Sequence, residues 1–195
     1  MTFLGCTFSP EGTRPLEEKV VTVNRFQQPV LVKDLRHCLG MLNFYRRFMP
    51  QTASIQASLH AALVVSTVKG SQPVDWTSTI AQAFEDCKAI FSRATLLAHL
   101  DPSTTLALFT DASDIAISVA LQQSACDVWQ PLAFYTHKLS PAQQKYSPYD
   151  RELLTVYEAI KYFRHMVEGL PFVIFTDHKP LTYAFQKRRA KCSPR

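Results

Sequence analysis

The feature that most constrains the fold is a pair of apolar segments that end in the same way. Residues 106–111 read LALFTD and residues 172–177 read FVIFTD, so each apolar run closes on Thr-Asp. Runs without polar alternation are typical of strands buried on both faces of a sheet. A helical pattern over residues 147–169 separates them. We therefore expect a strand-helix-strand unit with parallel strands, whose carboxyl ends meet at one edge of the sheet.

Residues 105–195 continue this pattern. Strands are expected at 115–123 and 129–139, joined by a hairpin near the polar SACD segment, and a further helix is expected to begin with KPLTYAF. The apolar stripe of the 147–169 helix predicts its buried face as Leu153, Val156, Tyr157, Ile160, Phe163 and Val167. These elements predict an α/β domain with a mixed sheet and flanking helices.

Residues 1–94 have mainly helical spacing. A strand at 3–9 and a turn at 10–15 precede helices expected within 15–26, 32–50, 53–63 and 77–94. The last of these is followed by a change to strand spacing, which places a boundary in 94–104. The sequence thus predicts a helical segment over 1–94 and a sheet domain over 105–195.

Three acids converge if this topology is correct. Asp111 and Asp177 emerge at the same sheet edge, and Glu152 lies in the first turn of the connecting helix, from which it could turn toward them. Neighbouring carboxylates repel unless a cation neutralises them, and oxygen ligands suit Mg²⁺ or Mn²⁺. Two such ions would suit phosphodiester hydrolysis. The alternative is that each Asp only caps a turn or a helix.

Composition narrows the classes of function. The five cysteines are widely spaced without a C-x-x-C pair, and the six histidines are scattered, so neither a disulfide framework nor a zinc site is indicated. There is no long apolar segment and no signal-peptide pattern, so we expect an intracellular protein, cytoplasmic or nuclear, without a membrane partner or a small-molecule cofactor.

The net charge of +5 comes from the last nine residues. These nine residues include five basic residues, and in the rest of the chain basic and acidic residues are equal in number. We expect nucleic-acid contacts from this tail, with a solvated terminus as the alternative. Arg46, Arg47 and Lys138 are further candidates for phosphate contacts, with a solvated surface as the equal alternative for each. The candidate tail residues are Lys187, Arg188, Arg189 and Lys191.

Longer motifs carry a resemblance to a known family. FTDASDIAISVALQQ, LAFYTHKLSPAQQKYSPYDRELLTVYEAIKYFRHMVEG and FVIFTDHKPLTYAF resemble the ribonuclease H domain of reverse transcriptases from gypsy-type long-terminal-repeat retrotransposons. Upstream, FLGCTFSPEG, LRHCLGMLNFYRRFMP and DWTSTIAQAFEDCKAIF resemble the thumb and connection that precede this domain in the Pol polyprotein.

The resemblance implies an activity and a site. Family members cut the RNA strand of an RNA–DNA hybrid with two Mg²⁺ or Mn²⁺ ions, and Asp111, Glu152 and Asp177 match three of the metal-binding acids. His178 has no role beyond possible substrate contact. The acids that fall on no family position are interpreted as turn, cap and helix-surface residues: Asp114, Asp150 and Glu158.

The chain departs from the family pattern in two ways. Ser118 stands where a glycine is common, and the last strand, its covering helix and a fourth aspartate would lie after Arg195. We therefore expect a weak or inactive nuclease. A polymerase Tyr-x-Asp-Asp motif is absent from the sequence, so DNA synthesis by this chain alone is not expected. The alternatives are a non-catalytic nucleic-acid-binding fragment and a truncated product without a role. The partners that the resemblance implies are an RNA–DNA hybrid and the remainder of a Pol polyprotein.

Overall fold

A computed structural model describes residues 1–64 and 69–186. The first part of the chain forms β1 (Thr2–Phe3), β2 (Cys6–Ser9), β3 (Gly12–Pro15), α1 (Glu17–Asn24), α2 (Val32–Phe44), the 3-10 turn η1 (Arg46–Phe48), α3 (Thr52–Ile55), α4 (Ala57–Val64) and α5 (Ser78–Ser92). The second part forms β4 (Thr105–Ala112), β5 (Ala116–Ala125), β6 (Val128–Lys138), η2 (Gln143–Lys145), α6 (Pro148–Val167), β7 (Phe172–Thr176) and α7 (Lys179–Gln186). The expected mixed α/β class is confirmed.

The larger sheet has the strand order β6-β5-β4-β7. β4 pairs in parallel with β7, with Thr110 opposite Thr176, whereas β5 is antiparallel to both β4 and β6. The expected hairpin between β5 and β6 turns at Cys126 and Asp127, which both have positive φ. Two positive-φ residues match the twist of a two-residue hairpin. The strand-helix-strand unit is thus present as predicted.

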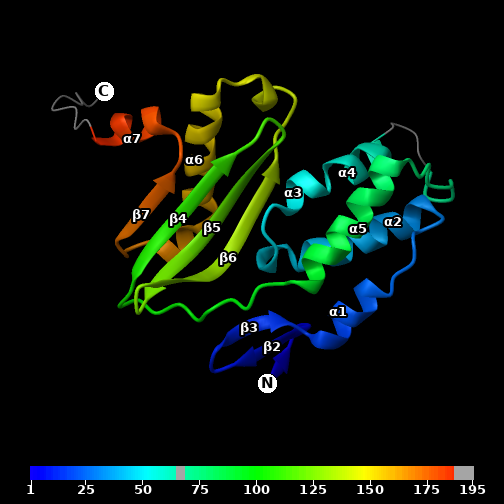
Figure 1. The fold of residues 1–195 in the computed structure, drawn as a ribbon, viewed down its shortest axis with the longest axis horizontal. Helices are drawn as coiled ribbons and strands as arrows, with labels where there is room; N and C mark the ends of the chain where they lie inside the picture. The colour runs from blue at the N-terminus through cyan, green and yellow to red at the C-terminus, as the bar shows by residue number, and fades with distance from the viewer. Residues whose placement is uncertain (65–68, 187–195) are drawn as a thin grey trace.

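Helix α6 packs on one face of this sheet and runs behind it in the view of Figure 1. Its buried face differs from the predicted stripe, because Leu153, Tyr157 and Ile160 are exposed. The buried residues of α6 are Glu152, Thr155, Val156, Ala159, Phe163 and Val167. The helix is rotated so that small and polar residues near its start face the sheet, and this rotation brings Glu152 inward.

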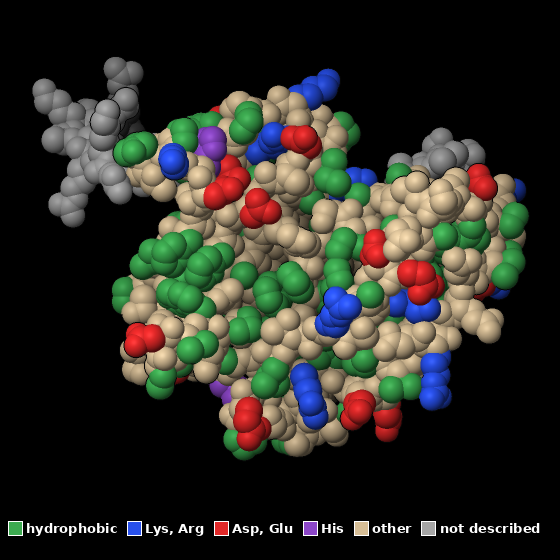
Figure 2. Space-filling model, viewed as in Figure 1, with side chains coloured by type: hydrophobic (Ala, Val, Ile, Leu, Met, Phe, Trp, Pro, Cys, Tyr) green, Lys and Arg blue, Asp and Glu red, His purple; other side chains and the backbone are tan. Residues whose placement is uncertain are grey.

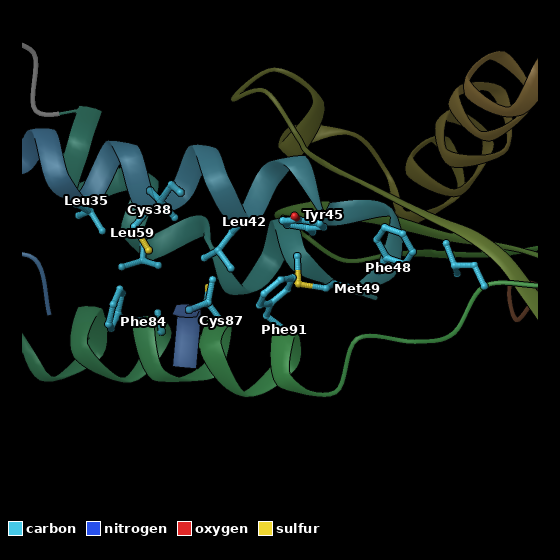
Figure 3. Packing of buried hydrophobic residues seen from close by; sticks show 14 residues of the cluster. Leu35, Cys38, Leu42, Tyr45, Phe48, Met49, Leu59, Phe84, Cys87 and Phe91 are labelled. Carbon is cyan, nitrogen blue, oxygen red and sulfur yellow. The ribbon is translucent and has the colours of Figure 1, made fainter. Parts of the chain in front are cut away.

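A second core lies among the N-terminal helices. Figure 3 shows α2 and α5 facing each other across side chains that include Leu42, Phe84 and Phe91, all almost fully buried. Every turn of α2 contributes to this layer because its apolar residues recur at steps of three and four. Trp76 extends the layer with an edge contact to Phe84 and donates its indole N–H to the Pro29 carbonyl at 2.9 Å.

The N-terminus differs from the expected strand and turn. Leu4 and Gly5 both have positive φ and divide the expected strand into β1 and β2, and the expected turn at 10–15 contains β3. The result is a small three-stranded sheet. At Gly12 a side chain would meet the Leu97 carbonyl oxygen at 2.2 Å, so glycine allows this sheet to pack closely against the segment before β4.

The two cores are connected by direct contacts. The Ala53 amide in α3 donates to the Thr136 hydroxyl in β6 at 3.2 Å, and the Ala98 amide donates to the Pro131 carbonyl in β6 at 2.8 Å. Figure 1 shows α3 beside the carboxyl end of β6. The boundaries expected at residues 94 and 105 stay a prediction. Among the described residues, no helix is long and apolar enough to cross a membrane.

Candidate metal and nucleic-acid site

Asp111 and Asp177 lie together at the carboxyl end of the parallel strand pair. Asp111 lies near the end of β4, and Asp177 follows β7 directly. Each aspartate comes one residue after the paired Thr110 and Thr176. Both aspartates are exposed and line one cavity of about 440 Å³ on the face of the sheet opposite α6. The pair of parallel strands therefore brings these two predicted acids to a shared, solvent-accessible space.

Three aromatic side chains, Phe109, Phe134 and Phe175, line this cavity among polar and small residues. Phe109 and Phe175 stack with ring centroids 4.8 Å apart, and Trp129 contacts both rings by its edge. Figure 2 shows hydrophobic side chains gathered over this face of the sheet, with acidic side chains beside them toward α7.

Glu152 approaches the same strand ends from the α6 side. Its side chain is buried, with 6% of the residue exposed. One carboxylate oxygen accepts the Ala112 amide at 3.1 Å, and the other faces the Thr176 hydroxyl at 3.5 Å. These contacts span the β4–β7 pair, so Glu152 is fixed beneath the strand ends from which the two aspartates emerge.

Burial raises the pKa of Glu152 above its usual range, while the hydrogen bond from Ala112 lowers it. The negative charges of Asp177 and Asp111 raise this pKa further, and the nearby His178 lowers it. When the pKa of an acid is higher in the folded state than in the unfolded state, its ionisation destabilises the folded protein. The protonation of Glu152 therefore depends on both aspartates, and the action of the three acids as one group stays a prediction.

The donor set fits a hard divalent cation, because all three side chains offer carboxylate oxygens whose mutual repulsion a cation would relieve. The side chains are not gathered tightly enough for this, since no group of three or more His, Cys, Asp or Glu in the described parts of the chain could hold a metal ion as placed. The carboxylate of Glu152 is held by Ala112 and Thr176. The assignment of Asp111, Glu152 and Asp177 as metal ligands therefore stays a prediction.

Three other acids have structural roles. Asp150 belongs to the start of α6, where Ser147 caps the helix by accepting the Asp150 amide and donating to its carboxylate. Asp114 forms an ion pair with Arg151. This pair connects the β4–β5 turn to the residue before Glu152. It could not be predicted from the sequence because its two residues are 37 positions apart. Glu158 pairs loosely with Lys161 on the helix surface.

His178 lies directly beside the acidic group. Its ring contacts that of Tyr149, and its Nε2 atom is buried without a hydrogen-bond partner among the described residues. A buried nitrogen of this kind could bind a substrate oxygen. The predicted nucleic-acid contacts of the basic tail lie outside the described residues: Lys187, Arg188, Arg189 and Lys191.

Comparisons with known proteins place these features in context. The family described as RNase H-like domain found in reverse transcriptase matches residues 76–174, which include Asp111 and Glu152 and end three residues before Asp177. The Tf2-3 and Tf2-4 transposon polyproteins of Schizosaccharomyces pombe (strain 972 / ATCC 24843) are each 36% identical over 92% of the chain. The chain spans 13% of the length of these curated relatives.

Solved structures show the same fold. A foamy viral protease-reverse transcriptase in complex with dsDNA superposes with a TM-score of 0.80 and 22% identity, covering 95% of this chain and 38% of that one. The corresponding protein in complex with an RNA/DNA hybrid gives a TM-score of 0.77, with 98% and 26% of the two chains covered and 22% identity. The overall arrangement is thus shared with proteins of distant sequence.

Proposed function

Because the chain belongs to the family of RNase H-like domains found in reverse transcriptase, we propose that its acidic group serves the hydrolysis of RNA in RNA–DNA hybrids. The observation that carries the proposal is that Asp111 and Asp177 line one cavity at a sheet edge, with Glu152 held at the same strand ends by Ala112 and Thr176. A buried acid with a raised pKa beside two further acids, as at Glu152, is typical of functional sites.

The residues would act in distinct ways. Asp111 and Asp177, which reach the cavity, would hold the Mg²⁺ or Mn²⁺ ions together with Glu152. Such ions, when bound, supply a water of lowered pKa and neutralise charge at the phosphate. The Ala112 amide and the Thr176 hydroxyl hold Glu152 in place. Glu152 must be ionised before its carboxylate can bind a cation. His178 lies beside these acids, and its positive charge would lower the pKa of Glu152.

The proposed substrate is the RNA strand of an RNA–DNA hybrid, and the proposed partner is the rest of a retroelement polyprotein. Support for the first comes from the shared fold with a structure that holds an RNA/DNA hybrid. Support for the second comes from the relatives, which are polyproteins. Recognition of RNA rather than DNA would rest on the 2′-hydroxyl groups and the shape of the minor groove.

The test is cleavage of an end-labelled RNA–DNA hybrid by the purified chain. We expect slow cleavage of the RNA strand with Mg²⁺ or Mn²⁺ and none with EDTA. Asp111→Asn should reduce the rate by at least about 100-fold, since it removes a ligand of the activating ions. Asp127→Asn, in the exposed hairpin turn, is the matched control and should cleave like the parent chain. Equal cleavage by Asp111→Asn would contradict the proposal.

A second candidate is nucleic-acid binding without catalysis. It is favoured by the separation of the acids, since no three metal-binding side chains in the described parts of the chain are gathered as a ready site. In that case the hybrid would bind with a strong salt dependence, and no RNA product would appear with either metal ion. Measuring binding and cleavage on the same hybrid separates the two candidates.

A further inference from the structure

One ion pair connects two separate elements beside the acidic group. Asp114 lies in the turn between β4 and β5, and its carboxylate accepts a hydrogen bond from the guanidinium of Arg151 near the start of α6. In the parts of the chain that the structure describes, the other three ion pairs join residues three or four positions apart on one helix. Such pairs can form in an isolated helix, whereas the pair of Asp114 and Arg151 depends on the tertiary fold.

The two side chains of this pair differ in exposure. The Asp114 side chain is 87% exposed, but that of Arg151 is only 11% exposed. Among the described residues, Asp114 provides the one carboxylate within ion-pair distance of Arg151, and the Nε atom of Arg151 is buried without a hydrogen-bond partner. A largely buried cation is unfavourable without an anionic partner. Arg151 therefore holds Asp114, and with it the turn, close to α6.

The turn that carries Asp114 is fixed by its own hydrogen bonds. The Ser113 hydroxyl accepts the amides of Ile115 at 3.3 Å and Ala116 at 3.0 Å. The same hydroxyl donates to the Ala116 carbonyl at 2.9 Å. A turn fixed in this way moves as a unit, so a restraint on Asp114 also restrains Ala112 at the end of β4.

A second contact joins the same two elements beside the ion pair. Ala112 donates its amide to Glu152 at 3.1 Å, and Glu152 follows Arg151 directly. Neighbouring residues of a helix point about 100° apart around its axis, because 3.6 residues make one turn. Contacts from both Arg151 and Glu152 to one strand end therefore fix the rotation of α6 as well as its distance from β4. In this rotation Glu152 is buried and Leu153 is exposed.

We propose that Asp114 and Arg151 are positioning residues for the acidic group. Their ion pair holds the β4–β5 turn against α6 and so keeps the Glu152 carboxylate at the end of the strand that carries Asp111. Neither positioning residue lines the cavity shared by Asp111 and Asp177. The consequence for RNA cleavage rests on the proposed function, whereas the positioning of Glu152 exists in the metal-free chain.

The test measures the hydrogen bond between Ala112 and Glu152 in EDTA, without metal or substrate. Amide hydrogen exchange of Ala112, followed by NMR, reports how often this bond opens. Asp114→Asn should speed this exchange about fivefold, which corresponds to the upper value for ion pairs with an exposed partner. Asp114→Glu keeps the charge and should exchange like the parent chain. Asp127→Asn, the same change in the exposed turn between β5 and β6, is the matched control and should leave the exchange of Ala112 unchanged.

Cleavage of the labelled hybrid gives the second readout. Asp114→Asn should lower the rate about 10-fold, the lower end of the effect of residues that orient metal ligands. Arg151→Met removes the other partner and should act in the same direction. Arg164→Met breaks the exposed ion pair of the same helix and should cleave like the parent chain.

The outcomes separate positioning from stability and from the proposed function. Faster exchange at Leu108, in the middle of β4, with unchanged exchange at Ala112 in Asp114→Asn would overturn the inference, because the ion pair would then add stability without positioning Glu152. Faster exchange at Ala112 with unchanged cleavage would also overturn it. A parent chain that does not cleave, together with faster exchange at Ala112 in Asp114→Asn, would support the positioning and contradict the proposed function instead.

Discussion

Replacing Glu152 by Gln tests the electrostatic account of the acidic group. The change keeps the size and shape of the side chain and removes its charge. Glu152 is 6% exposed and accepts one amide hydrogen at 3.1 Å, while two further acids raise its pKa. We therefore expect Glu152→Gln to stabilise the metal-free protein at neutral pH, although it removes a charged residue from the candidate site.

The size of the effect follows from opposing contributions. Desolvation of the buried carboxylate and repulsion by the two aspartates each destabilise by about 1 kcal/mol. Against this, a neutral acceptor weakens the hydrogen bond from Ala112 by about 1 kcal/mol. The net expectation is a stabilisation of about 1 kcal/mol, which corresponds to roughly 2–4 °C in melting temperature for a chain of this size.

The pH dependence provides a second readout. A raised pKa in the folded state means that the contribution of Glu152 to stability is complete below the unfolded pKa, near 4.3, and is lost as the pH rises through the folded pKa. The advantage of Glu152→Gln should therefore be small at pH 4 and full at pH 7.5.

The assay is urea unfolding in EDTA at both pH values. Glu158→Gln, on the surface of the same helix, is the control and should change stability by less than about 0.5 kcal/mol. A Glu152→Gln protein that is less stable than the parent at pH 7.5, or whose advantage does not change with pH, would refute the reasoning.

Two other predictions concern the surroundings of the site. Ser147→Ala removes the cap of α6 and should lower the free energy of unfolding by about 1 kcal/mol in urea titrations; an unchanged midpoint would show that the cap hydrogen bond contributes nothing. Burial raises the thiol pKa of Cys38 to about 11 and that of Cys87 to about 12. Ellman's reagent should therefore label the exposed Cys126 quickly, and label Cys38 and Cys87 only on unfolding. Fast labelling of Cys38 and Cys87 in the Cys126→Ser variant would contradict their burial.

The parallel strand pair was predictable because its pattern is local and unambiguous. Uninterrupted apolar residues in LALFTD and FVIFTD indicate buried strands, and the helix between them requires a crossover connection. The meeting of Asp111 and Asp177 then follows from topology alone. The family match and the fold are consistent with the resemblance found in the motifs.

The buried face of α6 was predicted incorrectly because its sequence has apolar residues on two sides. Leu153, Tyr157 and Ile160 fit a helical stripe, yet they are exposed, and the sheet selects the side with Thr155 and Ala159. Close packing against a sheet favours small residues there. Periodicity measures only how apolar residues repeat, so it could not identify which side meets the sheet.

The N-terminal sheet and the pocket that Arg46 and Lys138 both line were beyond sequence reasoning for different reasons. Strands β1 to β3 have only two to four residues each, too few to show a period of two. Arg46 and Lys138 were considered as phosphate contacts, but their meeting depends on the packing of α3 against β6, where bonded residues are 83 positions apart. Such convergence is a property of the tertiary fold.

The most direct test of the central claim, that Asp111, Glu152 and Asp177 bind a divalent cation, is the position of bound Mn²⁺. Paramagnetic broadening of backbone amide signals should be strongest at Ala112 and at the residues around Asp177, and the double substitution Asp111→Asn with Asp177→Asn should abolish it. Broadening centred elsewhere in the chain, or undiminished in the double variant, would contradict the account.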